Sequence, residues 1–154
     1  MVSSTKIEPI DFVLFGTLGD LARRKLLPSL YQLEKANLLH ESTTIIGVAR
    51  QSIPNKEYID TVRVNFDEFL GEEICEETWA RFTKRLKFVA INMVEEKDYK
   101  KLCKLVDVER VMVCYFATPP SIFGDICRGM DAAGVIDESV RVVLEKPIGH
   151  DFES

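Results

Sequence analysis

Two glycines, Gly16 and Gly19, interrupt the N-terminal part of the sequence and are followed at once by Asp20. An apolar run precedes them and a basic, leucine-rich stretch follows. Glycines at such a junction permit a tight turn close to a pyrophosphate, and the free N–H groups at a helix start attract anions. This is the chemistry of a phosphate-binding turn. The Gly-x-x-Gly spacing differs from the Gly-x-Gly-x-x-Gly fingerprint, and a turn with Asp20 as a helix N-cap accounts for these residues almost as well.

A single arginine, Arg50, follows the second apolar run in the segment GVARQS. In dinucleotide-binding folds an acidic residue past the second strand binds the ribose 2′-hydroxyl of NAD, whereas an arginine suits the 2′-phosphate of NADP. The segment offers Arg50 and no carboxylate. The alternative is a solvated surface arginine, but together with the glycine turn Arg50 favours NADP.

Residues able to move a proton are scarce. The only histidines are His40 and His150, which limits general acid–base chemistry. Lys146 stands at the carboxyl end of the last apolar run and precedes Pro147, so its ammonium group is placed where ligands bind in doubly wound sheets. It either pairs with substrate oxygens or phosphate, or is an ordinary surface lysine.

The composition excludes several classes of protein. The 154 residues are enough for one domain, and 46% hydrophobic and 29% charged residues are typical of a soluble globular protein. A net charge of −5 argues against a general nucleic-acid or membrane-surface binder. The sequence shows neither a membrane span nor a signal peptide. Four cysteines without a Cys-x-x-Cys pair predict reduced thiols in a cytoplasmic protein and no metal site, with Cys114 in the core.

Apolar runs and helical stretches alternate along the chain. The runs that predict strands are 12–16, 44–50, 87–91, 110–117 and 141–147. The stretches that predict helices are 20–39, 57–69, 75–86, 95–107 and 121–134. Pro28 should kink or restart the first helix. Strands without polar alternation indicate a parallel sheet covered on both faces. The order predicts an α/β fold, a doubly wound parallel sheet of Rossmann-like type in three αβα layers.

Four blocks of the sequence together resemble the coenzyme domain of the glucose-6-phosphate dehydrogenase family, especially its bacterial members. These blocks are FGTLGDLARRKLLPSLY, IIGVAR, YFATPPSIF and VVLEKPIGHD. They stand in the family's order and spacing from about Asp11 to Asp151. The resemblance implies an NADP-dependent oxidoreductase of the pentose phosphate pathway that oxidises glucose 6-phosphate to 6-phosphogluconolactone.

The resemblance also implies a set of site residues. The pyrophosphate would be wrapped by Gly16, Thr17, Leu18, Gly19, Asp20, Leu21, Ala22 and Arg23, and the 2′-phosphate held by Arg50. The adenosine half would lie near Asn92 and Met93, and the nicotinamide pocket would be lined by Ala117, Pro119 and Pro120. Lys146 would reach both the cofactor and the sugar phosphate, and the peptide bond before Pro147 would be cis.

Two departures from the family pattern affect what we expect. Leu18 stands where many relatives carry serine, threonine or lysine, so cofactor discrimination would rest mainly on Arg50. The family's catalytic histidine lies in an Arg-Ile-Asp-His-Tyr-Leu-Gly-Lys segment that this sequence lacks, so no catalytic residue is expected before Ser154. Residues 1–154 therefore read as an NADP-binding domain truncated before a second α+β catalytic domain, through which the full-length enzyme would form a homo-oligomer.

Two other functions remain open from the sequence. One is a different NAD(P)-dependent sugar or inositol dehydrogenase that also carries Glu-Lys-Pro after the fifth strand, although such enzymes usually have a Gly-x-Gly turn. The other is a non-catalytic dinucleotide-sensing module that needs only the fold.

Overall fold

A computed structural model of the chain describes residues 8–107, 110–136 and 140–144. Five parallel strands form one sheet in the order β3-β2-β1-β4-β5. The strands are β1 (Ile10–Phe15), β2 (Thr44–Ala49), β3 (Leu86–Ala90), β4 (Val111–Phe116) and β5 (Arg141–Leu144). The predicted doubly wound sheet is confirmed. Successive strands run outward from β1 to β3 and then return to β4, so the strand order reverses between β1 and β4.

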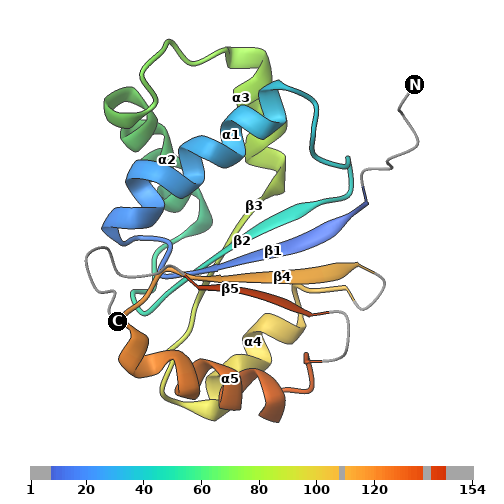
Figure 1. Cartoon of the computed structure of the whole chain (residues 1–154). Helices are drawn as coiled ribbons and strands as arrows, with labels where there is room; N and C mark the ends of the chain where they lie inside the picture. The colour runs from blue at the N-terminus through green and yellow to red at the C-terminus, as the bar shows by residue number, and fades with distance from the viewer. Residues whose placement is uncertain (1–7, 108–109, 137–139, 145–154) are drawn as a thin grey trace, which may run out of the picture.

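Helices cover both faces of the sheet, as Figure 1 shows. One face carries α1 (Leu27–Lys35), α2 (Asn55–Phe69) and α3 (Glu76–Arg85). The other carries α4 (Lys100–Cys103) and α5 (Phe123–Ala132). Three short segments complete the helical content: a π-helical turn, η1 (Ala22–Leu26), and the 3₁₀ turns η2 (Glu96–Tyr99) and η3 (Pro120–Ile122). None of the helices in these described ranges has the length and apolar composition needed to cross a bilayer.

A π turn interrupts the regular helix directly before Pro28, where the sequence predicts a kink or a restart. The N–H of Leu27 donates to the carbonyl of Ala22, one residue further back than in an α-helix, and Pro28 occupies the first turn of α1. Because proline has no N–H and its ring collides with the preceding turn, the wider π turn accommodates it. Helix α1 ends at Lys35, four residues before the predicted end.

The predicted long helix over 95–107 is wrong. The structure has a 3₁₀ turn and then the four-residue α4, which ends at Cys103. Two side chains in this stretch bond to residues outside it. The carboxylate of Asp98 accepts the backbone N–H of Asn92 at 2.7 Å, and the Sγ of Cys103 donates to the carbonyl of Ala133 at 3.1 Å.

Side chains alternate along β1 between two cores. Leu14 faces the α1–α3 layer, where it joins an aromatic cluster that includes Tyr31, Phe66 and Phe82. Val13 and Phe15 face the α4–α5 layer together with Cys114, which is fully buried as predicted. Both faces are apolar because both are covered, which is the usual state of a parallel sheet.

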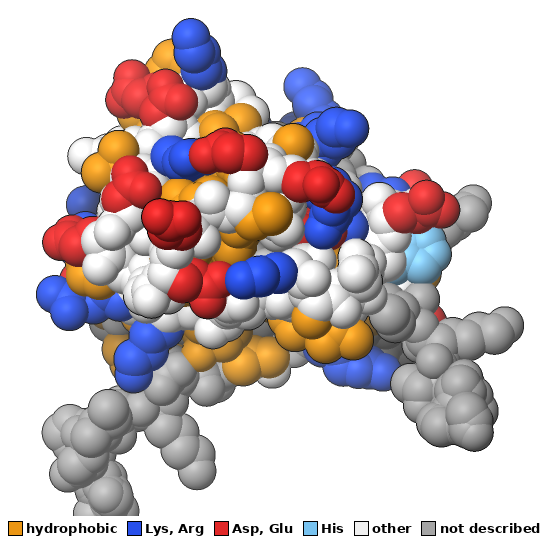
Figure 2. Space-filling model, turned by 90° about the horizontal axis from the view of Figure 1, so that it is seen from above, with side chains coloured by type: hydrophobic (Ala, Val, Ile, Leu, Met, Phe, Trp, Pro, Cys, Tyr) orange, Lys and Arg blue, Asp and Glu red, His pale blue; other side chains and the backbone are white. Residues whose placement is uncertain are grey.

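The outer surface of the α1–α3 layer is mixed in charge, with acidic and basic side chains interspersed (Figure 2). Ion pairs join its helices and loops, such as Lys35 with Glu72 and Arg63 with Glu76. Exposed pairs of this kind contribute little to stability. Within the described ranges, no group of three or more metal-ligating side chains gathers in one place.

Candidate functional site

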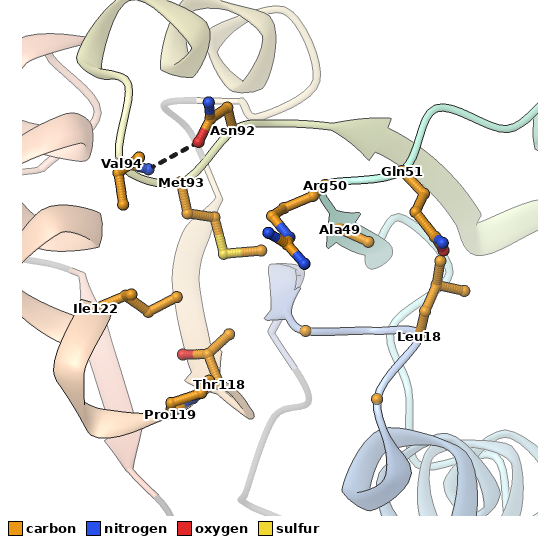
Figure 3. A pocket seen from close by; sticks show the side chains of 12 residues that line it. Leu18, Ala49, Arg50, Gln51, Asn92, Met93, Val94, Thr118, Pro119 and Ile122 are labelled. Atoms are coloured by element: carbon orange, nitrogen blue, oxygen red, sulfur yellow. Dashed lines mark hydrogen bonds between the residues drawn. The ribbon is translucent and has the colours of Figure 1, made fainter.

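A cavity of about 610 Å³ opens at the carboxyl edge of the sheet, where the strand order reverses. Ligands bind at this position in doubly wound folds, and the volume is in the range of cofactor pockets. The segments that follow β1, β2, β3 and β4 all contribute (Figure 3). The lining residues are Gly16, Leu18, Gly19, Ala49, Arg50, Gln51, Asn92, Met93, Val94, Thr118, Pro119 and Ile122.

The glycine turn packs directly on the backbone after β4. Gly16 has a φ of +88°, which glycine adopts freely. A Cβ on Gly16 would lie 2.5 Å from the carbonyl oxygen of Ala117 and 3.0 Å from Cγ2 of Thr118. The N–H of Gly19 donates to the carbonyl of Gly16 at 2.9 Å and closes the turn. The turn therefore needs glycine at its first position for two independent reasons, conformation and space.

Thr17 points away from the cavity. Its side chain is 1% exposed, and its Oγ1 lies 2.5 Å from the hydroxyl oxygen of Tyr58 on α2. Ala117 also lies behind the lining: its N–H donates to the carbonyl of Phe15 and its own carbonyl meets Gly16. Thr17 and Ala117 therefore support the glycine turn through contacts on the side that faces away from the cavity.

Asp20 is not the N-cap that the sequence suggested. The first backbone bond of the helical segment runs from the N–H of Arg23 to the carbonyl of Gly19, so Asp20 lies inside the first turn. Its carboxylate accepts hydrogen bonds from Arg23 and Arg24, each at 2.9 Å. The bond from Arg24, with a smaller contribution from Arg23, holds the pKa of Asp20 below its usual value.

The same contacts keep both guanidinium groups away from the cavity. Their carbon atoms lie 5.8 Å and 5.0 Å from the centre of the Phe69 ring, over its face. The side chains of Leu21 and Ala22 do not line the cavity either, and Ala22 is buried in the core. The part of this segment that remains turned toward the cavity is its backbone.

Arg50 and Gln51 form the polar wall at the end of β2. Both side chains are exposed, and Figure 3 shows the guanidinium of Arg50 directed into the cavity and Gln51 directed toward Leu18. Gln51 was not predicted from the sequence. Its position as a polar residue directly after Arg50 was the available signal.

The segment after β3 supplies the opposite wall. Asn92 uses its side-chain oxygen locally, accepting the N–H of Val94 at 3.3 Å. Met93 is 5% exposed, and its carbonyl accepts the hydroxyl of Tyr99 at 2.8 Å. Val94 is 60% exposed beside the cavity. This wall is apolar apart from its backbone and the Asn92 amide.

Thr118, at the end of β4, carries the one buried side-chain oxygen or nitrogen in the described ranges that has no hydrogen-bond partner. The two following residues, Pro119 and Pro120, have no N–H with which to satisfy it. A buried hydroxyl without a hydrogen-bond partner costs stability. Thr118 and the neighbouring Ile122 were not predicted from the sequence.

The cavity thus gathers seven of the residues that the sequence singled out: Gly16, Leu18, Gly19, Arg50, Asn92, Met93 and Pro119. The other described residues that the sequence singled out do not line it: Thr17, Asp20, Leu21, Ala22, Arg23, Ala117 and Pro120. Lys146, and the peptide bond before Pro147, lie outside the described residues. The lining residues that sequence reasoning missed are Ala49, Gln51, Val94, Thr118 and Ile122.

Comparison with known proteins agrees with this geometry. The family model for the NAD-binding domain of glucose-6-phosphate dehydrogenase matches residues 13–154. Glucose-6-phosphate 1-dehydrogenase of Dickeya dadantii is 44% identical over 155 aligned residues, which cover all of this chain and 32% of that protein. The enzyme of the same name from Mycolicibacterium smegmatis is 39% identical, covering 96% of this chain and 31% of that protein. The chain thus spans about a third of the length of these relatives.

Solved structures give the same result. The crystal structure of glucose-6-phosphate 1-dehydrogenase from Mycobacterium avium superposes with a TM-score of 0.84 at 30% identity, covering 97% of this chain and 32% of that one. A glucose-6-phosphate dehydrogenase in complex with its substrate glucose 6-phosphate superposes with a TM-score of 0.78 at 28% identity, covering 97% of this chain and 33% of that one. The chain therefore belongs to the glucose-6-phosphate dehydrogenase family, of which it represents the nicotinamide dinucleotide-binding domain.

Proposed function

We propose that this domain binds NADP and is the cofactor-binding part of a glucose-6-phosphate dehydrogenase. The observation that carries the NADP assignment is the lining of the cavity. Among the described residues, this lining combines the Gly16–Gly19 turn with Arg50 and has no acidic side chain. A carboxylate in this position would bind the 2′-hydroxyl of NAD and repel a 2′-phosphate, whereas an arginine fork binds the phosphate.

The residues present fit such a ligand. Gly16 and Gly19 line the cavity without a side chain, so a phosphate can approach their backbone closely. The first intrahelical bond starts at the N–H of Arg23, which leaves the backbone N–H groups of Asp20, Leu21 and Ala22 without intrahelical partners. These three groups and the positive end of the helix dipole suit a pyrophosphate.

The other parts of the dinucleotide have matching walls. Arg50, with Gln51 beside it, would hold the 2′-phosphate, and Asn92 and Met93 would lie along the adenosine. Thr118 and Pro119 would border the nicotinamide. When bound, NADP supplies the hydride acceptor.

For the whole enzyme we propose the oxidation of glucose 6-phosphate to 6-phosphogluconolactone. The names of the relatives and the substrate bound in one structural neighbour support this reaction. Lys146 is our candidate for a contact with the sugar phosphate. The described part of the cavity lining contains no histidine, and His40 lies in a loop where its Nδ1 accepts the N–H of Ser42. We therefore propose that the catalytic base comes from outside the described residues, in a cytoplasmic homo-oligomer.

A calorimetric titration of the chain with NADP and, separately, NAD tests the cofactor assignment. We expect NADP to bind more tightly, and Arg50→Ala to weaken NADP binding about 10- to 100-fold while changing NAD binding little, because a charge-assisted bidentate contact is lost. Arg128→Ala is the matched control, since Arg128 is an exposed arginine on α5 that does not line the cavity. Equal affinity for both cofactors, or an Arg50→Ala variant that binds NADP like the wild type, would refute NADP selection by Arg50.

A further inference from the structure

A pair of buried hydroxyl groups lies beneath the glycine turn and has no part in the cavity lining. Oγ1 of Thr17 and the hydroxyl oxygen of Tyr58 are 2.5 Å apart, and the two residues are 1% and 0% exposed. Thr17 belongs to the turn after β1, and Tyr58 to the first turn of α2. The strand between them carries Gly47, where a Cβ would lie 2.5 Å from the Tyr58 hydroxyl oxygen and 2.8 Å from Oγ1 of Thr17. The turn after β1, strand β2 and helix α2 therefore pack closely around the hydrogen bond between Thr17 and Tyr58.

Tyr58 is held in place independently of Thr17. Its ring packs on Phe88 of β3 with the ring centres 4.9 Å apart. Its backbone N–H donates to the carbonyl of Pro54 at 3.0 Å. Burial raises the pKa of Tyr58 to about 12, so the phenol stays protonated at physiological pH. The hydroxyl is therefore a fixed point to which the turn is bonded.

The hydrogen bond between Thr17 and Tyr58 connects the two sides of the cavity where we propose that the pyrophosphate and the 2′-phosphate bind. On one side is the turn, which carries Leu18 and Gly19. On the other is the segment from Arg50 to Pro54, which connects β2 to the start of α2. The backbone N–H of Thr17 also donates to the carbonyl of Val48 at 3.1 Å, so this residue is tied to both β2 and α2.

We propose that Tyr58 is a positioning residue for the dinucleotide. Through Thr17 it fixes the glycine turn relative to Arg50 and Gln51, and so sets the affinity for the phosphate-bearing half of the ligand. This inference rests on the proposed function of the cavity. NADP depends on the spacing of both sides because its pyrophosphate lies at the turn and its 2′-phosphate at Arg50. NAD, which lacks the 2′-phosphate, depends on that spacing less.

Three variants separate positioning from simple stabilisation: Tyr58→Phe, Thr17→Val and the double variant. Each single change leaves one buried hydroxyl without a partner, so its melting temperature should fall. The double variant removes both hydroxyls and keeps the apolar shape, so much of that stability should return. We expect NADP affinity to be about three- to tenfold weaker in all three variants, the effect of losing about one hydrogen bond, and NAD affinity to change less.

Tyr31→Phe is the matched control. Tyr31 is fully buried on α1, and its hydroxyl accepts the N–H of Cys75 far from the cavity lining. This variant should melt earlier yet bind NADP like the wild type. If the double variant regains stability and also binds NADP as tightly as the wild type, Tyr58 does not position the ligand and the proposal is overturned.

A ligand-free measurement distinguishes this proposal from the proposed function. Amide hydrogen exchange at Thr17 and Gly19, whose N–H groups are bonded to Val48 and Gly16, should be faster in the double variant than in the wild type. Unchanged exchange at both amides would overturn the positioning role. Failure of the wild type to bind either dinucleotide would instead overturn the proposed function, whatever the exchange rates.

Discussion

At the level of single residues, the site depends on positions where a side chain is excluded. Gly16 was predictable from the sequence because a glycine between an apolar run and a helix usually marks a tight turn. Thr118 and Gln51 were not, because their importance comes from what surrounds them. The Thr118 hydroxyl has no hydrogen-bond partner, and the two prolines that follow it have no N–H to donate. Gln51 lines the cavity because its side chain at the end of β2 is directed toward Leu18. Such relations become visible only once the segments are assembled.

Replacing Gly16 by alanine tests the turn. The new Cβ would collide with the Ala117 carbonyl at a φ of +88°, so we expect a loss of roughly 2–4 kcal/mol in unfolding free energy and much weaker NADP binding. Gly71→Ala is the control, because Gly71 has a φ of +80° but no atom within 4 Å of its Cβ position. It should cost only about 1–2 kcal/mol and leave NADP binding intact. Equal losses from the two variants in chemical denaturation would show that the contact with Ala117 is unimportant.

The thiols should differ strongly in reactivity. A hydrogen bond from the Thr78 side chain, aided by the backbone N–H of Thr78, lowers the pKa of the exposed Cys75. Burial raises the pKa of Cys114 to about 12. A lowered pKa increases the thiolate fraction near neutral pH, so iodoacetamide should label Cys75 rapidly and Cys114 only after unfolding. Thr78→Val should slow the labelling of Cys75, as followed by peptide mass spectrometry. Labelling of Cys114 in the native protein before Cys75 would contradict this order.

At the level of elements, the strands were predicted well because each coincides with a mainly apolar run. In the central strands β1 and β2 that run is mostly buried, whereas Val142 and Val143 of the edge strand β5 are exposed. The helices were predicted less well where side chains bond to residues outside the predicted helix. The amphipathic pattern of 95–107 is compatible with one long helix, but Asp98 and Cys103 bond to other segments instead. Likewise, Pro28 indicates a disturbance of the first helix without showing that a π turn resolves it.

A buried ion pair holds α1 to α3 and to the loop before β2. Glu34 is 3% exposed and pairs with Arg85, which is 9% exposed. The guanidinium also donates to the carbonyl of Thr43 at 2.9 Å. Glu34→Ala would leave this charge buried without its partner, and we expect it to lower the unfolding free energy by about 3–5 kcal/mol.

The control for Glu34 is Glu77→Ala, because Glu77 is 87% exposed and pairs with Arg81 at the surface. It should change stability by less than about 1 kcal/mol. Denaturant unfolding measures the unfolding free energy of both variants. If Glu34→Ala lowered it as little as Glu77→Ala does, water would be satisfying the hydrogen bonds of Arg85. The double variant Glu34→Ala with Arg85→Met should recover part of the lost stability, since no unpaired charge remains.

At the level of the whole molecule, the reversal of strand order determines where the site lies. Four segments that are far apart in the sequence end at one edge of the sheet, and the cavity lies among them. The order of the blocks along the sequence was sufficient to predict this edge. The role of each residue within it was not predictable, because the sequence does not show that Thr17 faces inward or that Asp20 binds Arg23 and Arg24.

The chain should bind its cofactor without performing the reaction. The described lining of the cavity contains no histidine, lysine or carboxylate to accept the proton of a sugar hydroxyl. With NADP and glucose 6-phosphate present, we expect absorbance at the NADPH band to rise no faster than in a blank without protein. Saturable turnover by the 154-residue chain would show that it carries its own base.

A crystal structure of the chain with NADP bound would test the proposed cofactor site most directly. We expect the pyrophosphate at the first-turn N–H groups of Asp20, Leu21 and Ala22, with the 2′-phosphate within hydrogen-bond distance of Arg50. We also expect the nicotinamide on the Thr118 and Pro119 side of the cavity. A dinucleotide bound in the reverse direction, or with its 2′-phosphate away from Arg50, would contradict the proposed site.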